Sequence, residues 1–200
     1  MNVIPPALER LIADFGRLPG VGRKTASRLA MHLLRRPAVE AQGLAKSLTE
    51  LHRLITMCST CCAFSEEDPC EICRNSERDD ELVCVVEEPG DLIAIEKTSS
   101  FTGKYHILHG VLSPADGIGP KELKIDLLLE RIRRHRVREI LIATSSTVPG
   151  EATAAYLIKH LQENSRLRVT RLACGIPMGM DIKYADAMTL SRAIAARQEP

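Results

Sequence analysis

The first third of the chain repeats apolar residues at the spacing of amphipathic helices. Apolar positions recur every three or four residues over 7–15, in a stretch that begins near residue 23, and over 39–55, which predicts three helices. Pro5 and Pro6 precede the first stretch and can open its helix. The aligned apolar positions are Ala7, Leu8, Leu11, Ile12 and Phe15, then Ala26, Leu29, Ala30 and Leu33, which should face inward, and Leu44, Leu48, Leu51 and Ile55.

Beyond residue 80 the pattern changes to short apolar runs separated by helical stretches. The runs at 82–86, 105–109, 139–144 and 167–172 predict strands, and the stretches at 91–97, 121–135, 150–163 and 187–195 predict helices. Strands that alternate with helices are typical of a parallel α/β sheet. In such sheets the functional groups gather at the carboxyl ends of the strands.

The composition is that of a folded water-soluble protein. Of the 200 residues, 44% are hydrophobic and 26% are charged, which allows a core without disulfide bonds. No apolar run approaches the roughly 18–20 residues that a membrane span needs. Glu9, Arg10 and Asp14 interrupt the N-terminal apolar pattern, which is unlike a secretory signal. We therefore expect a cytoplasmic protein rather than a membrane or secreted one.

The charges are unevenly distributed, although the net charge is only +1. Residues 65–96 are strongly acidic, whereas 1–64 and 97–200 are both basic. This polarity predicts separate surfaces for an anionic partner and a basic partner. Aromatic residues make up 3% of the chain and Trp is absent, so a platform that stacks nucleic-acid bases is not expected.

The cysteines predict a zinc site. Cys58, Cys61, Cys70 and Cys73 have the spacing CxxC-x8-CxxC, in which two turns can direct four thiolates at one ion. Two disulfides or a redox CxxC are the alternatives, but a reducing compartment disfavours disulfides. Cys62 could replace Cys61 as a ligand, although Cys61 reproduces the spacing of the second pair.

The predicted zinc ion is structural, with one ion per chain. Four thiolates fill the coordination shell and leave no position for a water molecule, so hydrolysis at this ion is not expected. The segment contains only Phe64 and Ile72 as large apolar residues, and its folding should therefore depend on the metal. Cys84 and Cys174 are expected to be small buried hydrophobic residues.

A glycine-rich turn between the first two helices predicts a DNA contact. Gly20 and Gly22 lie in Pro19-Gly20-Val21-Gly22, just before the second helix, and Lys24 and Arg28 follow on one side of it. Unpaired N–H groups at the positive end of a helix bind anions. The pattern LPGVGxxxAxxL resembles the helix-hairpin-helix motif, which grips DNA phosphates without reading bases. The alternative is an ordinary helical hairpin with a solvated basic face.

Two predicted strand ends resemble the Toprim fold of topoisomerases and primases. Glu87 and Asp91 follow one strand, but Ser145 and Thr147 stand where active members carry an acidic pair. Neutral hydroxyls do not supply the charge that Mg²⁺ requires. We therefore expect a non-catalytic scaffold whose acidic end is a protein-docking or weak cation surface. The rival hypothesis is a Mg-dependent nuclease or primase that uses Glu87, Asp91 and Glu151.

No other catalytic signature is present, and no catalytic residue is assigned. The sequence lacks a GxSxG elbow, a P-loop and an HExxH pair. The basic run from Arg131 to Arg138 could contact phosphate or could be a solvated helix end. A zinc-built adaptor for protein interactions, without a DNA role, is a third hypothesis.

The order of these segments resembles the RecR family of bacterial recombination mediators over essentially the whole chain. The resemblance is carried by LPGVGRKTASRLA, the cysteine segment ending CEIC, VVEEPGDLIAIE, YHILHGVLSPADGIGP, GEATAAYL and GIPMGMDIKYADAMTLSRA. It implies an α/β protein with four parts: a helix-hairpin-helix DNA-binding region (1–56), a four-cysteine zinc finger (57–79), a Toprim-type parallel α/β domain (80–173) and a C-terminal helical oligomerisation segment (174–200). Ser145, Pro149, Cys174 and Met180 depart from the residues usual in the family.

The resemblance also implies a function in DNA repair without enzymatic activity. Proteins of this family form tetrameric rings that can encircle DNA, and they act with RecO and RecF to load recombinase on gapped DNA. By motif position, Lys24 and Arg28 would contact DNA with the Gly20–Gly22 turn, and Glu87 and Asp91 would lie on the surface that meets RecO. The segment after Gly175 would take part in subunit exchange.

Overall fold

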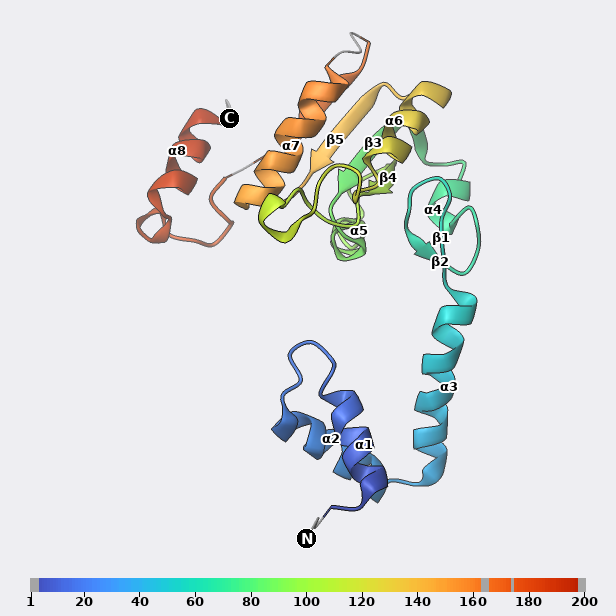
Figure 1. Ribbon diagram of the computed structural model, residues 1–200. Helices are drawn as coiled ribbons and strands as arrows, with labels where there is room; N and C mark the ends of the chain where they lie inside the picture. Colours follow the sequence, from blue (N-terminus) through green and yellow to red (C-terminus); the bar gives the residue numbers. More distant parts are fainter. Residues whose placement is uncertain (1–3, 163–165, 174, 198–200) are drawn as a thin grey trace. The chain divides into compact units, whose positions relative to one another are not determined.

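The computed structural model of the protein describes residues 4–162, 166–173 and 175–197 (Figure 1). The chain divides into two compact units, Met1–Ile55 and Thr56–Pro200. Each unit has apolar clusters of its own. In the described part of the chain, no helix is both long and apolar enough to cross a membrane.

Three helices form the N-terminal unit: α1 (Pro6–Phe15), α2 (Arg23–Arg35) and α3 (Ala38–Leu54). The small side chains of Ala26 and Ala30 let α2 pack closely on α1 around Ile12. The prediction that Leu29 faces inward is wrong, because Leu29 is 37% exposed. At 3.6 residues per turn, Leu29 lies about 80° around the helix from the strip formed by the two alanines, beyond the reach of α1.

The second unit begins with the cysteine segment. Two short strands, β1 (Thr56–Met57) and β2 (Phe64–Ser65), pair in antiparallel fashion, and a single helical turn, α4 (Glu71–Arg74), follows. Sequence periodicity did not predict these elements, because each is only two to four residues long. Their shape depends on turn hydrogen bonds rather than on an apolar repeat.

A four-stranded parallel sheet follows, and the prediction of a parallel α/β fold is confirmed. The strands are β3 (Asp79–Val86), β4 (Gly103–Ile107), β5 (Glu139–Ala143) and β6 (Arg168–Arg171), in the order β4-β3-β5-β6. The connecting helices are α5 (Pro89–Glu96), α6 (Ile125–Arg134) and α7 (Val148–Leu161), and α8 (Ala187–Ala195) lies near the C-terminus. Two 3₁₀ turns occupy Pro114–Asp116 and Ile182–Tyr184.

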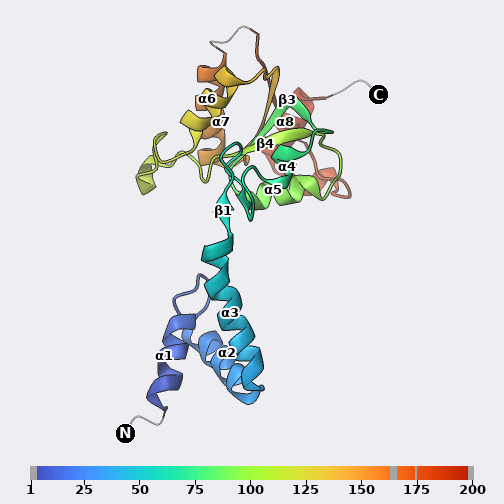
Figure 2. The same ribbon diagram turned by 90° about the vertical axis from the view of Figure 1, so that its right-hand side faces the viewer.

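Alternate side chains of β3 enter two different cores. Val83 and Val85 join the cluster that contains Leu128 of α6 and Leu157 of α7, whereas Cys84 joins the cluster that contains the cysteine segment. This alternation follows from the two-residue period of a strand. Figure 2 shows α6 and α7 on one side of β3 and β4, and α5 on the other. The expectation that Cys84 is buried is confirmed, whereas Cys174 lies outside the described residues.

Candidate functional site

The structure brings Cys58, Cys61, Cys70 and Cys73 together. Their sulfur atoms all lie within 4.8 Å of one another, and Cys61 Sγ is 3.5 Å from Cys70 Sγ. Zn–S bonds of about 2.3 Å in a tetrahedron place sulfur atoms roughly 3.8 Å apart, so these four thiols fit a zinc ion. Among the described residues they form the one group of His, Cys, Asp or Glu side chains with this property. Cys62 is not part of it.

Local backbone hydrogen bonds shape the first cysteine turn. The N–H of Cys58 donates to Ala63 O at 2.8 Å, and the N–H of Cys62 donates to Cys58 O at 2.9 Å. Cys62 adopts a left-handed backbone with φ of 64°, which tightens the turn. Burial alone would raise the pKa of Cys58, but N–H groups of Cys70 and neighbouring residues lower it to about 7. The turn therefore favours a thiolate at Cys58.

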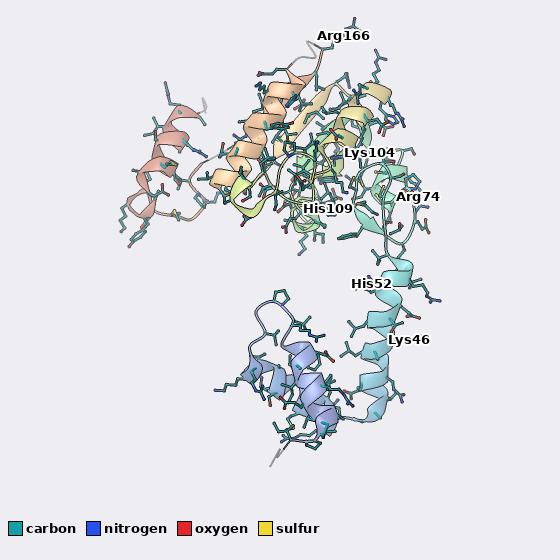
Figure 3. All side chains as sticks on the ribbon, in the orientation of Figure 1. Lys46, His52, Arg74, Lys104, His109 and Arg166 are labelled. Atoms are coloured by element: carbon teal, nitrogen blue, oxygen red, sulfur yellow. The ribbon has the colours of Figure 1, made fainter. Side chains whose placement is uncertain are left out.

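The edge strand β4 holds this cysteine segment. The Lys104 ammonium donates to Cys73 O at 2.8 Å, the N–H of Ile107 donates to Cys61 O at 2.9 Å, and His109 Nε2 lies 2.7 Å from Cys62 O. Lys104 is buried, and the ring of His109 also contacts Phe64 edge-on at 5.3 Å (Figure 3). Sequence reasoning missed these anchoring roles, since the partners are far apart in the chain. The segment thereby covers a strand edge that would otherwise be open.

The predicted DNA contact lies at the N-terminus of α2. Gly20 has φ of 76°, a conformation that favours glycine, and Gly22 is the N-cap of α2 with no side-chain cap. Lys24 and Arg28 are both exposed on the first turns of this helix. No ion pair involves Lys24 or Arg28 in the described part of the chain, whereas Arg23 pairs with Glu9 at 2.7 Å. The arrangement leaves an uncapped, positively charged helix end, as an anion site requires.

The carboxyl ends of the strands carry the other predicted residues. Glu87 and Asp91 are both half-buried, and each accepts a hydrogen bond from a backbone N–H group. Glu87 Oε1 accepts from the N–H of Ser145 at 2.7 Å, and Asp91 Oδ2 accepts from the N–H of Glu88 at 2.9 Å in a capping box at the start of α5. The exposed acid between them is Glu88, which the sequence reasoning did not single out.

The positions expected to carry an acidic pair hold hydroxyls in mutual contact. Ser145 Oγ lies 2.7 Å from Thr147 Oγ1, and Thr147 caps α7 by accepting from the N–H of Gly150. Glu151 lies in the first turn of α7 and pairs with Arg171 at 2.8 Å and with Arg192 at 3.0 Å. The guanidinium of Arg171, followed by that of Arg192, lowers the pKa of Glu151. The structure does not group Glu87, Asp91 and Glu151 into a metal-binding set.

Models of known families match almost the whole chain in four adjacent stretches. The helix-hairpin-helix of RecR matches residues 8–52, and the four-cysteine zinc finger domain of RecR matches residues 55–75. A Toprim domain matches residues 81–173, and the C-terminal region of RecR matches residues 175–198. The stretch matched by the zinc finger model contains the four clustered cysteines.

Curated relatives give the same result over the full length. The protein is 52% identical over 194 residues to the recombination protein RecR of Syntrophotalea carbinolica, with 97% of each chain covered. It is 50% identical over 199 residues to that of Anaeromyxobacter dehalogenans, with 100% of each chain covered. Identity to that of Moorella thermoacetica is 49% over 195 residues, or 98% of each chain. The chain therefore belongs to the RecR family of recombination proteins.

Proposed function

We propose that the protein is a DNA-binding recombination mediator without enzymatic activity, which acts with RecO and RecF to load recombinase on gapped DNA. Its membership of a family of recombination proteins supports a role in recombinational repair. The observation that carries the proposal is the uncapped N-terminus of α2, where Lys24 and Arg28 are exposed beside the Gly20–Gly22 turn.

The proposed DNA contact is electrostatic and independent of base sequence. The first N–H groups of α2 have no partner within the helix, and the helix dipole adds positive charge at the same end. A phosphate would accept from these N–H groups, and Lys24 and Arg28 would add charge on the same side. Such contacts position a duplex or a single strand but carry no base readout, and they weaken as salt rises.

Replacing both cations tests the proposal. We expect the double variant Lys24→Ala/Arg28→Ala to bind DNA at least about tenfold more weakly, and the slope of log affinity against log salt to fall by about two. A matched control is Lys46→Ala/Arg53→Ala, which removes two exposed cations of α3 that pair with Glu50. Affinity that is equal in the two variants would contradict the proposal.

The zinc ion proposed for the four cysteines is structural, with one ion per chain. When bound, it would hold the two cysteine turns together, and four thiolates would leave no open position for substrate. The chain's own contribution is the set of bonds from Lys104, Ile107 and His109 to carbonyls of the cysteine segment. These bonds would orient the ligands and join the finger to the sheet.

We also propose assembly into a ring-like homotetramer. No residue of α3 is buried, and Leu44, Leu48 and Leu51 lie exposed along it. An apolar stripe of this kind on a soluble chain is typical of an interaction surface. Several copies facing one lumen would strengthen a weak phosphate contact through effective concentration.

The rest of the proposal concerns the partner surface of the sheet unit, the absence of catalysis and the location of the protein in the cell. Glu87 and Asp91 would lie on the surface that contacts RecO, beside the exposed Glu88. The absence of catalysis is supported by the Ser145–Thr147 hydroxyl pair and by the ion pairs that engage Glu151. A cytoplasmic location suits a finger of reduced thiols.

A further inference from the structure

The basic run from Arg131 to Arg138 consists of one buried arginine and several exposed ones. Arg131 is buried, and its Nη1 donates to Tyr105 O at 2.6 Å, so this residue joins α6 to β4. The later arginines are exposed at the C-terminal end of α6 and in the turn that leads to β5. This is the amino edge of the sheet, where its parallel strands begin. We call its exposed arginines the amino-edge arginines: Arg133, Arg134, Arg136, Arg138 and Arg168.

Backbone pairing brings the amino-edge arginines together from distant parts of the sequence. The N–H of Arg138 donates to Glu81 O, and the N–H of Arg168 donates to Arg138 O, each at 2.8 Å. Neighbouring strands are about 4.8 Å apart, so the first residues of β5 and β6 lie side by side. Figure 3 shows the exposed Arg166 at this same end of the sheet. The two basic segments therefore form one surface.

The carboxylates at this edge are less exposed than the guanidinium groups. Glu81 pairs with both Arg136 and Arg138. Glu139 pairs with Arg168 at 3.5 Å. The two glutamate side chains are 27% and 28% exposed, whereas the three arginine side chains are 69% to 90% exposed. An anion that approaches from solvent therefore meets guanidinium groups before it meets carboxylates.

Cations exceed the acids that are available to neutralise them. The carboxylate of Glu81 is shared between two arginines. Asp79 accepts from the N–H of Glu81 at 2.8 Å, and Asp80 pairs with Lys104. In the described part of the chain, Arg133 has no ion pair. The amino edge therefore retains positive charge that is open to a ligand.

The composition of this surface favours a phosphate backbone over an acidic protein. Among the described residues, no large apolar side chain is exposed within 130–138 or 168–171. The centres of protein interfaces are apolar or aromatic and depleted in charge, whereas interfaces with nucleic acid are polar and positive. The planar guanidinium group also matches the oxygen atoms of phosphate in a two-pronged contact.

We propose that the amino-edge arginines form a second binding surface for the phosphate backbone of DNA, built by the sheet unit alone. The inference rests on the proposed function, because it adds a contact to the ligand already proposed for the N-terminus of α2. The contact reads no bases and weakens as salt rises. Two phosphate contacts in one chain strengthen binding through effective concentration.

Removal of two cations from the full-length protein tests the second surface. Arg133 and Arg136 are suitable because Arg133 has no ion pair in the described chain and Glu81 keeps Arg138 as a partner when Arg136 is replaced. We expect Arg133→Gln/Arg136→Gln to bind gapped duplex DNA about threefold to tenfold more weakly at low salt. The slope of log affinity against log salt should fall by about one to two.

A matched variant controls for the change in net charge. Lys97 and Lys121 are exposed lysines of the same unit, and they lie at the end of α5 and in the segment before α6. Lys97→Gln/Lys121→Gln removes the same charge and should bind DNA within about twofold of wild type. Equal affinity in the two double variants would overturn the second surface.

Removal of an acid should have the opposite effect, which a damaged fold would not produce. Glu130 of α6 is 42% exposed and pairs with Arg134 at 2.5 Å. Glu130→Gln should therefore strengthen DNA binding about twofold to fivefold at low salt. Glu77→Gln, which changes an exposed acid before β3, should not. Unchanged binding in Glu130→Gln would contradict the proposal.

The outcomes separate this surface from the rest of the proposed function. If Lys24→Ala/Arg28→Ala loses affinity and Arg133→Gln/Arg136→Gln does not, the contact at α2 stands and the second surface is overturned. The reverse result supports the second surface and removes the contact at α2. If the arginine variant binds DNA normally but no longer retains polyglutamate, the surface fits an acidic protein and the proposal is overturned. A wild-type protein that does not bind DNA would overturn both.

Discussion

His106 is fully buried on β4. Its Nε2 lies 2.8 Å from Lys124 O, so the neutral ring donates to this carbonyl, and Nδ1 has no hydrogen-bond partner among the described residues. Burial, with a smaller contribution from the charge of Arg131, lowers the pKa of His106 from 6.5 to about 4. Between pH 6.5 and about pH 4, the unfolded chain therefore binds a proton at His106 that the folded protein does not bind.

This difference predicts a loss of stability in mild acid. The folded pKa lies below the unfolded one, so the free energy of unfolding should fall as pH drops from 6.5 to about 4, by up to about 3 kcal/mol, and level off below that. Urea unfolding at several pH values should show a smaller fall for His106→Gln, which keeps a donor for Lys124 O. The other titratable groups are the same in both proteins, so the difference isolates His106. Equal slopes would contradict the prediction.

Cys61 and Cys62 are adjacent but should differ in zinc binding. Only Cys61 has its sulfur within 4.8 Å of the sulfur atoms of Cys58, Cys70 and Cys73. Metal analysis of the reduced wild-type protein should give about one zinc per chain. Cys61→Ala should lose most of it, and Cys62→Ala should retain it. A zinc-free Cys62→Ala that still folds would show that the ligand set is different.

The grouping of side chains within one short segment could be predicted from sequence. Hydrogen bonds between residues far apart in the chain could not. The four clustered cysteines lie within 58–73, where spacing alone brings them together. The hydrogen bond that Glu87 accepts from the N–H of Ser145 joins residues 58 positions apart, and no local pattern indicated it. Lys104 and His109 gave no local signal, since their carbonyl partners belong to the finger.

The turn from β5 into α7 should not tolerate a larger residue at Gly150. A Cβ there would lie 2.3 Å from Ser145 O and 2.7 Å from Glu87 Oε1. Neither group can move easily, because the N–H of Ser145 donates to the same carboxylate. We expect Gly150→Ala to lower the free energy of unfolding by about 1–3 kcal/mol, measured by urea titration.

Gly43 provides the matched control, since it lies in α3 with nothing within 4 Å of an added Cβ. Gly43→Ala should raise stability by about 0.5–1 kcal/mol, because alanine is the better helix former. If Gly150→Ala were as stable as wild type, the close approach between this turn and Glu87 would not exist in solution.

Helices and strands were predictable where the apolar period was long enough, but the first residues of α5 and α7 were not. The helix predicted over 187–195 is α8, whereas the helix predicted over 150–163 begins earlier, at Val148, because the side chain of Thr147 caps it. Likewise α5 begins at Pro89 rather than residue 91, since Glu88 and Asp91 form a capping box. Side-chain caps set these boundaries, and an apolar repeat does not record them.

At the scale of the whole molecule, the finger and the sheet form one unit and the first three helices form another. The cysteine segment shares an apolar cluster with Val86, Tyr105 and Ile107 of the sheet, whereas the cluster around Ile12 contains residues of the N-terminal unit only. Metal binding should therefore stabilise β4 and its neighbours without affecting α2.

Removing zinc with a chelator in reducing buffer tests this division. Metal and folding are coupled in small zinc modules, so the bonds from Ile107 and His109 to the cysteine segment should weaken when the ion leaves. Hydrogen exchange over 103–109 should accelerate by at least about tenfold, while exchange over 23–35 should stay within about twofold of the loaded protein. Adding zinc back should restore the slow rates. Equal acceleration in both segments, or none over 103–109, would show that the finger does not support the sheet in this way.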